Sequence, residues 1–329
     1  MKKNALAILA LLLLASALTL STLPTAKAAQ AVLDTHPQIT VDGDPSDWTG
    51  TAPTVDNTLT ISNSEFIWKD ATGDDTGPGM WEYPTSFNTG EADLLELRIC
   101  WNDSYLFVLF KLREMTVGQW NRTAIDLTIS TNQTPGSGET NGWYAEADMK
   151  VNLTADWEYQ LEIIPSTRIR VEDSSWATVA DPTTDPALLI ANSSTNKCFE
   201  VGIPIAVIGS PAGKIWDFTC IVGLQSMLGS AGSGHFAEIE ETADANNPGG
   251  GVSGAWEDPD AFDAAFYNTT AEQEAAFSVF TAGGGDNAVV VVSAYLEIPE
   301  FPLLLPYGFA IMAAIILAAS FTMRKKLNL

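Results

Sequence analysis

Short runs of alternating apolar and polar residues recur along most of this chain, and each is bounded by Gly, Pro, Asn, Asp or Ser. Alternation with a period of two places successive side chains on opposite faces of a β-strand. Many strands at this spacing predict an all-β fold, an antiparallel β-sandwich of jelly-roll-like form. The expected strands cover residues 39–41, 59–62, 93–101, 105–112, 124–130, 159–164, 168–172, 199–205, 216–224 and 288–298.

The clearest hairpin joins the strands expected over 93–101 and 105–112. Asn102 and Asp103 separate the two strands, and both residue types tolerate the left-handed conformation of a tight turn. The alternation predicts that one strand buries its residues at three positions and that the other buries three opposite them. These residues are Leu95, Leu97 and Ile99, with Leu106, Val108 and Phe110 opposite.

Helical signal is thin in comparison. The best candidate covers residues 271–280, where Thr270 could cap the first turn and Gln273 would lie within it. A threonine in the capping position accepts a hydrogen bond from a backbone N–H group that has no partner inside the helix. We therefore expect one short helix late in the domain.

The two ends of the chain differ in composition from the part between them. Residues 1–28 combine a basic start, an apolar core and Ala-Lys-Ala at 26–28, the pattern of a secretory signal peptide. Residues 300–323 predict a transmembrane anchor, because 301–323 carry no charge and suffice to span ~30 Å of hydrocarbon. A buried core helix is the poorer alternative, since the stretch is apolar on all sides. The basic tail 324–329 is then cytoplasmic, and residues 29–299 form an ectodomain outside the cell.

The start of this anchor resembles a known sorting signal. Pro299, Glu300, Phe301 and Pro302 directly precede the apolar run. They resemble the Pro-Glu-Phe tails of archaeal surface proteins, in which a short motif, one helix and a basic end form the signal. The resemblance implies an archaeal source and a place at the cell surface. In some of those proteins a membrane transpeptidase removes the helix, and whether it is kept here stays open.

Charge is concentrated between the two ends. All 41 acidic residues and ten of the 16 basic ones lie between residues 29 and 300, which gives that segment a net charge of −31. Such an acidic surface repels nucleic acid and anionic lipid. It suits high salt, divalent cations or a crowded surface layer, although solvated carboxylates alone would also account for it.

Export bears on two further groups of residues. Cys198 and Cys220 lie on neighbouring expected strands and could form a disulfide, while three buried thiols that include Cys100 are the open alternative. Asn-x-Ser/Thr sequons are candidates for glycosylation. They begin at Asn102, Asn121, Asn132, Asn152, Asn192 and Asn268.

Two stretches carry a resemblance to a known family. QITVDGDPSDW at 38–48 is similar to the opening of family 9 carbohydrate-binding modules and related DOMON-like sandwiches. DATGDDTGPGMWEYPT at 70–85, followed by the Asp-led hairpin at 92–112, resembles the C-terminal domain of glucodextranases, also found in surface-anchored pullulanases. The resemblance covers most of 38–298 and implies a β-sandwich that contains calcium and binds carbohydrate. The glycosidase domain that such modules normally accompany is not found in these 329 residues.

The loop in this motif carries the candidate metal ligands. Asp70, Asp74 and Asp75 supply carboxylates among glycines that let the backbone turn tightly, and Asp93 could close the site from the next strand. Calcium takes about six to eight oxygen ligands in flexible geometry. The spacing is not that of an EF-hand, and solvated turn carboxylates are the alternative. A second acidic turn, at 42–47, predicts plain turn chemistry.

Aromatic residues in loops are the candidate sugar contacts. Sugar rings stack on flat aromatic surfaces while polar groups hold the hydroxyls. The candidates are Trp81 and Tyr83 beside the acidic loop, Trp143 near a turn and Trp256 in a Gly-rich loop. Trp68, Trp101 and Trp216 fall in strand patterns and are expected in the core.

No catalytic pattern emerges from the sequence. Its two histidines lack a nucleophile context, and among 41 acidic residues a carboxylate pair has no specificity. We expect a non-catalytic, surface-anchored protein that binds polysaccharide, with α-glucans as one class, and holds a structural calcium. The alternative is a structural envelope protein whose calcium-dependent contacts join neighbouring envelope proteins without a sugar ligand.

Overall fold

The computed structural model describes residues 39–298, apart from 117–121, 141–146, 148, 166–167, 213, 227–235, 252–258, 279–289 and 293–295. The predicted signal peptide, membrane anchor and basic tail, at 1–28, 300–323 and 324–329, lie outside the described residues and stay predictions. Among the described residues, no helix combines the length and apolar character needed to cross a membrane.

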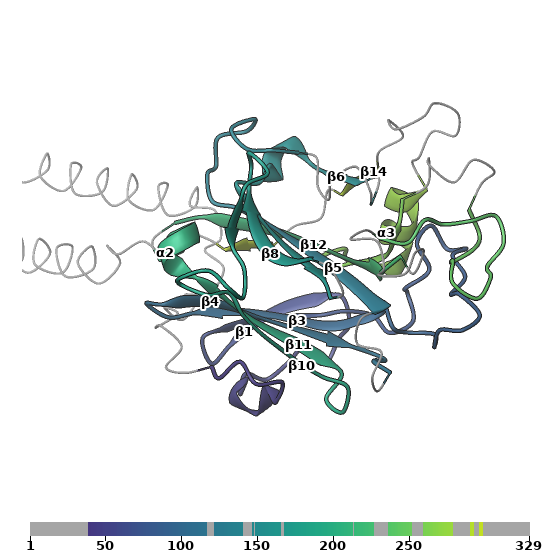
Figure 1. Cartoon of the computed structure of the whole chain (residues 1–329), viewed down its shortest axis with the longest axis horizontal. Helices are drawn as coiled ribbons and strands as arrows, with labels where there is room; N and C mark the ends of the chain where they lie inside the picture. The colour runs from purple at the N-terminus through teal and green to yellow at the C-terminus, as the bar shows by residue number, and fades with distance from the viewer. Residues whose placement is uncertain are drawn as a thin grey trace, which may run out of the picture. The chain divides into compact units, whose positions relative to one another are not determined.

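Two antiparallel sheets pack against each other, which confirms the predicted all-β sandwich (Figure 1). The first sheet has the strand order β1 (Thr58–Ser62), β2 (Glu65–Lys69), β3 (Leu94–Trp101), β4 (Tyr105–Leu112), β11 (Cys198–Pro204) and β10 (Leu189–Ser193). The second has the order β13 (Ala261–Ala264), β12 (Trp216–Leu224), β5 (Thr123–Ser130), β7 (Tyr159–Ile164), β8 (Arg168–Asp173) and β9 (Thr178–Ala180), and β15 (Leu296–Ile298) also pairs with β12. A separate parallel pair joins β6 (Met149–Val151) to β14 (Val290–Val292).

The main core lies between the two sheets and follows from the alternation of side chains along each strand. One buried cluster takes Phe66, Ile99 and Phe110 from the first sheet and Leu127 and Phe218 from the second. Full burial of one such side chain stabilises the folded state by roughly 1.5–3 kcal/mol. Both faces of β5 and β12 are buried, because loops cover the outer face of the second sheet as well.

The β3–β4 hairpin forms as predicted, with two corrections. The register shifts between Leu94 and Glu96, so Leu94 is buried in the core while Leu95 is only half-buried. The expectation that Leu95 lies in the core was wrong, because this bulge changes the face to which the strand's first residues point. The turn also avoids the left-handed conformation. Instead, the Asn102 Oδ1 atom accepts backbone hydrogen bonds from Ser104 at 2.8 Å and Tyr105 at 2.9 Å.

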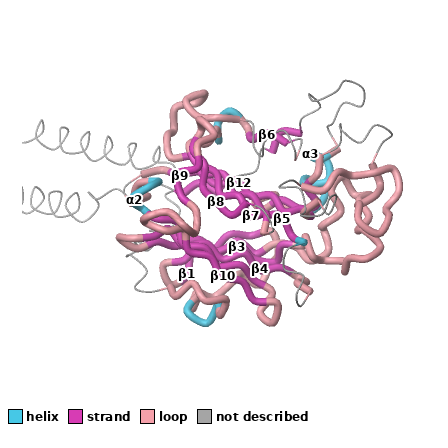
Figure 2. Tube along the Cα trace, viewed as in Figure 1, coloured by secondary structure: helices cyan, strands magenta, loops and turns pink. Residues whose placement is uncertain are grey.

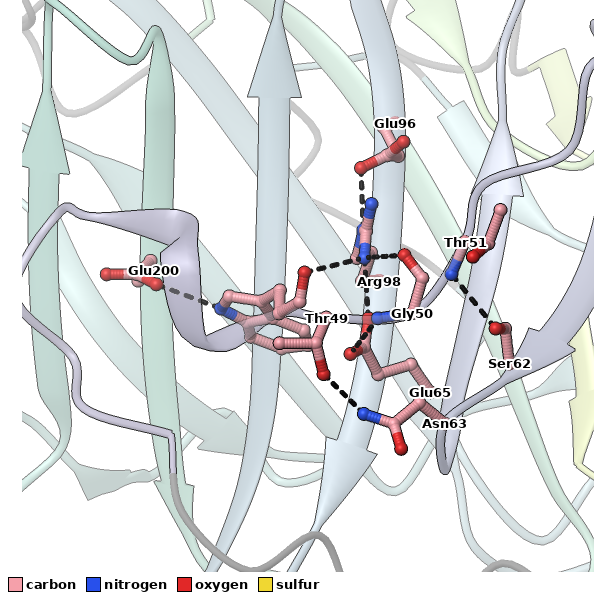
Figure 3. A network of polar contacts seen from close by, with 10 residues as sticks. Thr49, Gly50, Thr51, Ser62, Asn63, Glu65, Glu96, Arg98 and Glu200 are labelled. Carbon is pink, nitrogen blue, oxygen red and sulfur yellow. Dashed lines mark hydrogen bonds and ion pairs between the residues drawn. The ribbon is translucent and has the colours of Figure 1, made fainter.

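The segment before β1 lies against the outer face of the first sheet, held by a buried ionic network (Figure 3). Arg98 on β3 donates to the carbonyl oxygens of Trp48 at 3.2 Å and Gly50 at 2.9 Å, and to Glu65 at 2.7 Å. The Trp48 indole in turn donates to Glu200 on β11 at 2.9 Å. The QITVDGDPSDW opening therefore has a structural role in covering this sheet.

The second acidic turn shows the turn chemistry expected of it. The Asp42 side chain accepts from the backbone N–H of Asp44 at 2.8 Å, and the Asp44 side chain accepts from Ser46 at 3.2 Å. Asp44 thereby caps the 3₁₀ helix η1 (Pro45–Asp47).

The remaining local predictions concern the cysteines and the helix. Cys100, Cys198 and Cys220 are free and buried, so the disulfide alternative is not realised. The predicted late helix is α3 (Thr270–Phe277), with Thr269 rather than Thr270 as its cap. Thr270 is thereby free to donate elsewhere. Two shorter helices are α2 (Ile205–Ile208) and η4 (Leu153–Ala155).

Candidate cation site and adjoining cleft

The loop that follows β2 folds tightly because of its glycines. The Thr76 carbonyl oxygen accepts from the backbone N–H groups of Gly79, Met80 and Trp81 at 2.9–3.0 Å. Gly77 has φ of +55°, and a Cβ atom there would overlap the Trp81 indole. A glycine is therefore required for the indole to fold back over the loop. Loop segments near α3 gather at one end of the sandwich (Figure 2).

Three carboxylates from distant parts of the chain meet beside this loop. Asp74 lies in the loop, Asp93 directly precedes β3, and Asp263 lies on β13. Each offers an oxygen atom within 4.8 Å of those of the other two. The three residues are 2 %, 0 % and 0 % exposed, and the neighbouring Asp70 is 2 % exposed. This arrangement, here called the carboxylate cluster, comprises Asp70, Asp74, Asp93 and Asp263.

Protein hydrogen bonds orient the cluster but do not saturate it. Gly73 N–H donates to Asp93 Oδ2 at 2.8 Å, Leu94 N–H donates to Asp263 Oδ2 at 2.7 Å, and Thr270 Oγ1 donates to Asp74 Oδ2 at 3.2 Å. Three buried oxygen atoms have no hydrogen-bond partner among the described residues: Asp70 Oδ2, Asp74 Oδ1 and Asp93 Oδ1. Buried carboxylate oxygens rarely stay without a partner, so these three atoms are candidate ligands for a cation.

Within the part of the chain that the structure describes, positive charge offsets the cluster's negative charge only in part. Arg113 Nη1 lies 3.2 Å from Asp93 Oδ2, but the Arg113 side chain is 44 % exposed, so solvent weakens its field. Burial first, and then neighbouring carboxylates, raise the pKa of Asp93 to about 7 and that of Asp74 to about 6. Burial also raises the pKa values of Asp70 and Asp263 well above their usual range. Burial is thus the larger cause of these shifts, and the neighbouring carboxylates add to it.

The cluster's donor set fits a hard cation. Every donor of the cluster is a carboxylate oxygen, three of these oxygens have no hydrogen-bond partner among the described residues, and the ligating segments come from a loop and two strand ends. Calcium prefers oxygen-only ligands in flexible geometry, whereas zinc and copper prefer nitrogen or sulfur. The residues present therefore fit calcium.

A cleft of about 430 Å³ opens beside the cluster. It is lined by Gly73, Asp75, Thr76, Trp81, Glu82, Tyr83, Pro84, Thr85, Phe87, Thr89 and Arg113. Tyr83 and Phe87 are half-buried in its wall, and the Arg122 guanidinium lies 4.2 Å over the Phe87 ring. The cleft thus combines aromatic surface with carboxylates, hydroxyls and one guanidinium.

A family model described as the C-terminal binding-module, SLH-like, of glucodextranase matches residues 66–292. This chain belongs to that family. The matched span includes the carboxylate cluster and the whole cleft, so the predicted family is confirmed for the region that carries the site. The glucodextranase-type module is a binding module, not a catalytic domain. A comparison with curated proteins found no match.

The module brings together most of the predicted metal ligands. Asp70, Asp74 and Asp93 lie in the carboxylate cluster, while the Asp75 side chain lines the cleft and accepts a hydrogen bond from the Tyr83 hydroxyl. Burial raises the pKa of Asp75. Asp263 was missed by sequence reasoning, because a single aspartate inside an apolar strand gives no signal of its partners.

The aromatic candidates divide into three groups. Tyr83 is half-buried in the cleft, as a sugar contact requires. Trp81 also lines the cleft, but it is only 4 % exposed and belongs to the main core. Burial in the core therefore explains why a tryptophan stands in this loop. Trp143 and Trp256 lie outside the described residues.

Sequence reasoning missed Phe87 and Arg113, which line the same cleft. Of the tryptophans expected in the core, Trp68, Trp101 and Trp216 are all buried.

Five of the six sequon asparagines lie among the described residues, and each is exposed or half-buried. Asn132 and Asn268 are exposed, and the Asn268 amide donates to Glu272 at 3.1 Å. Asn102, Asn152 and Asn192 are half-buried, and Asn121 lies outside the described residues. Glycosylation at these positions stays a prediction.

Proposed function

We propose that this chain is a non-catalytic carbohydrate-binding protein whose glycan site is the cleft and whose carboxylate cluster holds a structural calcium ion. The observation that carries the proposal is the position of an aromatic and polar cleft inside the binding module, directly beside the cluster. Aromatic surface and a few convergent polar groups are the usual features of a sugar site.

Each part of the cleft has a role in this proposal. The half-buried rings of Tyr83 and Phe87 offer apolar surface for the C–H face of a sugar ring. Glu82 and Asp75 can accept hydrogen bonds from hydroxyls, and the Arg113 guanidinium can donate to ring or hydroxyl oxygens. Mixed donors and acceptors without a dominant positive charge suit a neutral polysaccharide, with α-glucans as the first class to test.

The calcium proposal rests on the three oxygens that have no hydrogen-bond partner among the described residues and on the negative charge that Arg113 offsets only in part. Asp74, Asp93 and Asp263 would hold the ion, and Asp70 would add charge or a further ligand. Bound calcium supplies the positive charge that these buried carboxylates lack.

We further propose that the protein works at the cell surface, where it captures polysaccharide near the envelope. The support is in the sequence: a predicted signal peptide, an apolar run followed by a basic tail, and a motif before the run that resembles archaeal sorting signals. The segment between these ends has a net charge of −31, which favours solubility in salty or crowded surroundings.

The proposal is tested with the full chain purified in mild detergent. Calcium content is measured by elemental analysis, and binding to α-glucans and other polysaccharides by isothermal titration. We expect about one calcium per chain and saturable binding to one class of glycan. Replacing Tyr83 by Ala should abolish that binding. Tyr105→Ala, which changes a half-buried tyrosine on the far face of the first sheet, is the matched control.

A chain that binds calcium but none of these glycans would contradict the carbohydrate role. It would favour the structural envelope protein, in which calcium supports contacts with neighbouring envelope proteins.

A further inference from the structure

One side chain of the cleft contacts all three segments that carry the cluster's closest carboxylates. That side chain is Tyr83, which lines the cleft. Its hydroxyl donates to Asp75, the residue after Asp74. The same hydroxyl accepts from the N–H of Ala92, the residue before Asp93, at 2.9 Å.

The third contact is made by the Tyr83 ring. Its centroid lies 4.9 Å from that of Phe262, the residue before Asp263, in a tilted arrangement. The Phe262 carbonyl oxygen also accepts from Gly77 in the acidic loop at 2.9 Å. Each of Asp74, Asp93 and Asp263 therefore has a chain neighbour in direct contact with Tyr83.

We propose that Tyr83 couples the two sites, so that a cation in the cluster and a ligand in the cleft strengthen each other's binding. The inference rests on the proposed function for the nature of both ligands. Without a cation, the buried carboxylates repel one another and favour separation of the three segments. Bound cation draws the segments together and so fixes Tyr83. A ligand stacked on the Tyr83 ring stabilises the same arrangement from the other side.

The other aromatic walls of the cleft do not have this connection. Trp81 is held by the core and by the turn at Gly77, and one face of Phe87 is covered by Arg122. Arg113 also spans the two sites, since it pairs with Asp93 and lines the cleft. Its positive charge opposes a cation at Asp93, so its effect on cation binding has the opposite sign to that of Tyr83.

Linkage makes the coupling measurable from either site, because the factor by which one ligand changes the other's affinity is the same in both directions. The first measurement uses calcium alone on the full chain. Tyr83→Phe removes the hydroxyl and keeps the ring on Phe262. It loses both hydrogen bonds of that hydroxyl and should weaken calcium binding at least about fivefold, because the loss of one hydrogen bond already gives about this factor. Tyr105→Phe should leave calcium affinity unchanged, and Arg113→Gln should increase it.

The second measurement uses maltoheptaose as the probe, with calcium and with chelator. Coupling of typical size makes binding about tenfold tighter in calcium, and Tyr83→Phe should reduce this ratio. Melting curves in saturating calcium confirm that each variant is folded. An unchanged calcium affinity in Tyr83→Phe would overturn the coupling, as would an absence of calcium binding to the wild-type chain. Failure of maltoheptaose to bind would count against the proposed ligand, while the calcium measurement would still decide the role of Tyr83.

Discussion

Asp263 on β13 places a carboxylate oxygen within 4.8 Å of one on Asp93, although β13 and β3 belong to different sheets. The contact joins the two layers of the sandwich at the end where the cleft opens. A hydrogen bond also joins the two layers there, since Leu94 N–H on β3 donates to the Asp263 side chain on β13 at 2.7 Å. A cation between these residues would therefore act as a link between the sheets as well as a local ligand.

Asp263→Asn should weaken calcium binding at least tenfold. Loss of an outer-shell partner of a metal ligand already costs about 10–100-fold in affinity, and this change removes charge from the cluster itself. Calcium titration of the full chain, followed by the calcium-induced rise in melting temperature, measures the effect. Asp103→Asn, at the exposed β3–β4 turn, is the control and should behave as the wild type. Equal calcium affinities in the two variants would remove Asp263 from the site.

The stability of the calcium-free protein should fall as pH rises from about 5 to 8. The folded-state pKa values of Asp74 and Asp93 are raised to about 6 and about 7, above the ordinary aspartate value of about 3.9. Their contribution to stability is complete below about pH 4 and is lost as pH rises through the two raised values.

Melting temperatures across this pH range, in chelator and in calcium, provide the measurement. Calcium requires the deprotonated carboxylates, so its stabilising effect should grow over the same range. Glu172 on β8 also has a pKa raised to about 7, by burial and by Glu162. It lies away from the cluster, so a smaller decrease in stability with rising pH should persist when calcium is bound. Parallel pH profiles with and without calcium would show that the cluster does not hold the ion.

Gly77→Ala should destabilise the acidic loop and disturb the cleft. The new Cβ would overlap the Trp81 indole, and φ at this position is +55°. Gly136 has φ of +80°, and a Cβ atom added there would meet no other atom within 4 Å, so Gly136→Ala carries the backbone cost without the overlap. A left-handed non-glycine residue costs about 1–3 kcal/mol, and we expect Gly77→Ala to exceed its control. Denaturant unfolding compares the two variants, and equal losses would mean that the indole moves aside freely.

Arg98→Met should lower the free energy of unfolding by about 3–5 kcal/mol, because it removes the guanidinium that pairs with the fully buried Glu65 at 2.7 Å. The network in Figure 3 also fixes the segment before β1, so the variant should loosen that segment. Lys69→Met, which breaks an exposed pair with Asp56, should cost at most about 1 kcal/mol. Chemical denaturation measures the free energy of unfolding of both variants. Similar decreases would mean that the buried Arg98 network contributes no more to stability than the exposed pair does.

The sequence predicted most of the long strands and the acidic loop, because both depend on local order. Residues 39–41 were expected as a strand but do not form one, and the shorter strands β2, β6, β9, β10 and β13 were not among those expected. Alternation sets the face of each residue along β4 and β5, and the Asp- and Gly-rich run after β2 places Asp70 and Asp74 together. Strand bulges and long-range partners do not follow from local pattern. The shift at Leu95 and the arrival of Asp263 at the cluster both depend on how the two sheets stack.

The burial of Trp81 has a similar origin. A tryptophan in a Gly-rich loop resembles an exposed platform, yet the tight turn at Gly77 folds its indole into the core. Arg113 and Phe87 gave no sequence signal because each joins the cleft only through the folded positions of β4 and the loop 70–93. The cleft could therefore be predicted in part, from Tyr83 and Asp75, but its walls could not.

The most direct test of the account is isothermal titration of the full chain with soluble α-glucans and the other polysaccharides, in calcium and again in chelator. We expect saturable binding to one of these glycans in calcium, weaker binding in chelator, and none for Tyr83→Ala. A wild-type chain that holds calcium and binds none of these glycans, or binds one equally well in Tyr83→Ala, would contradict it.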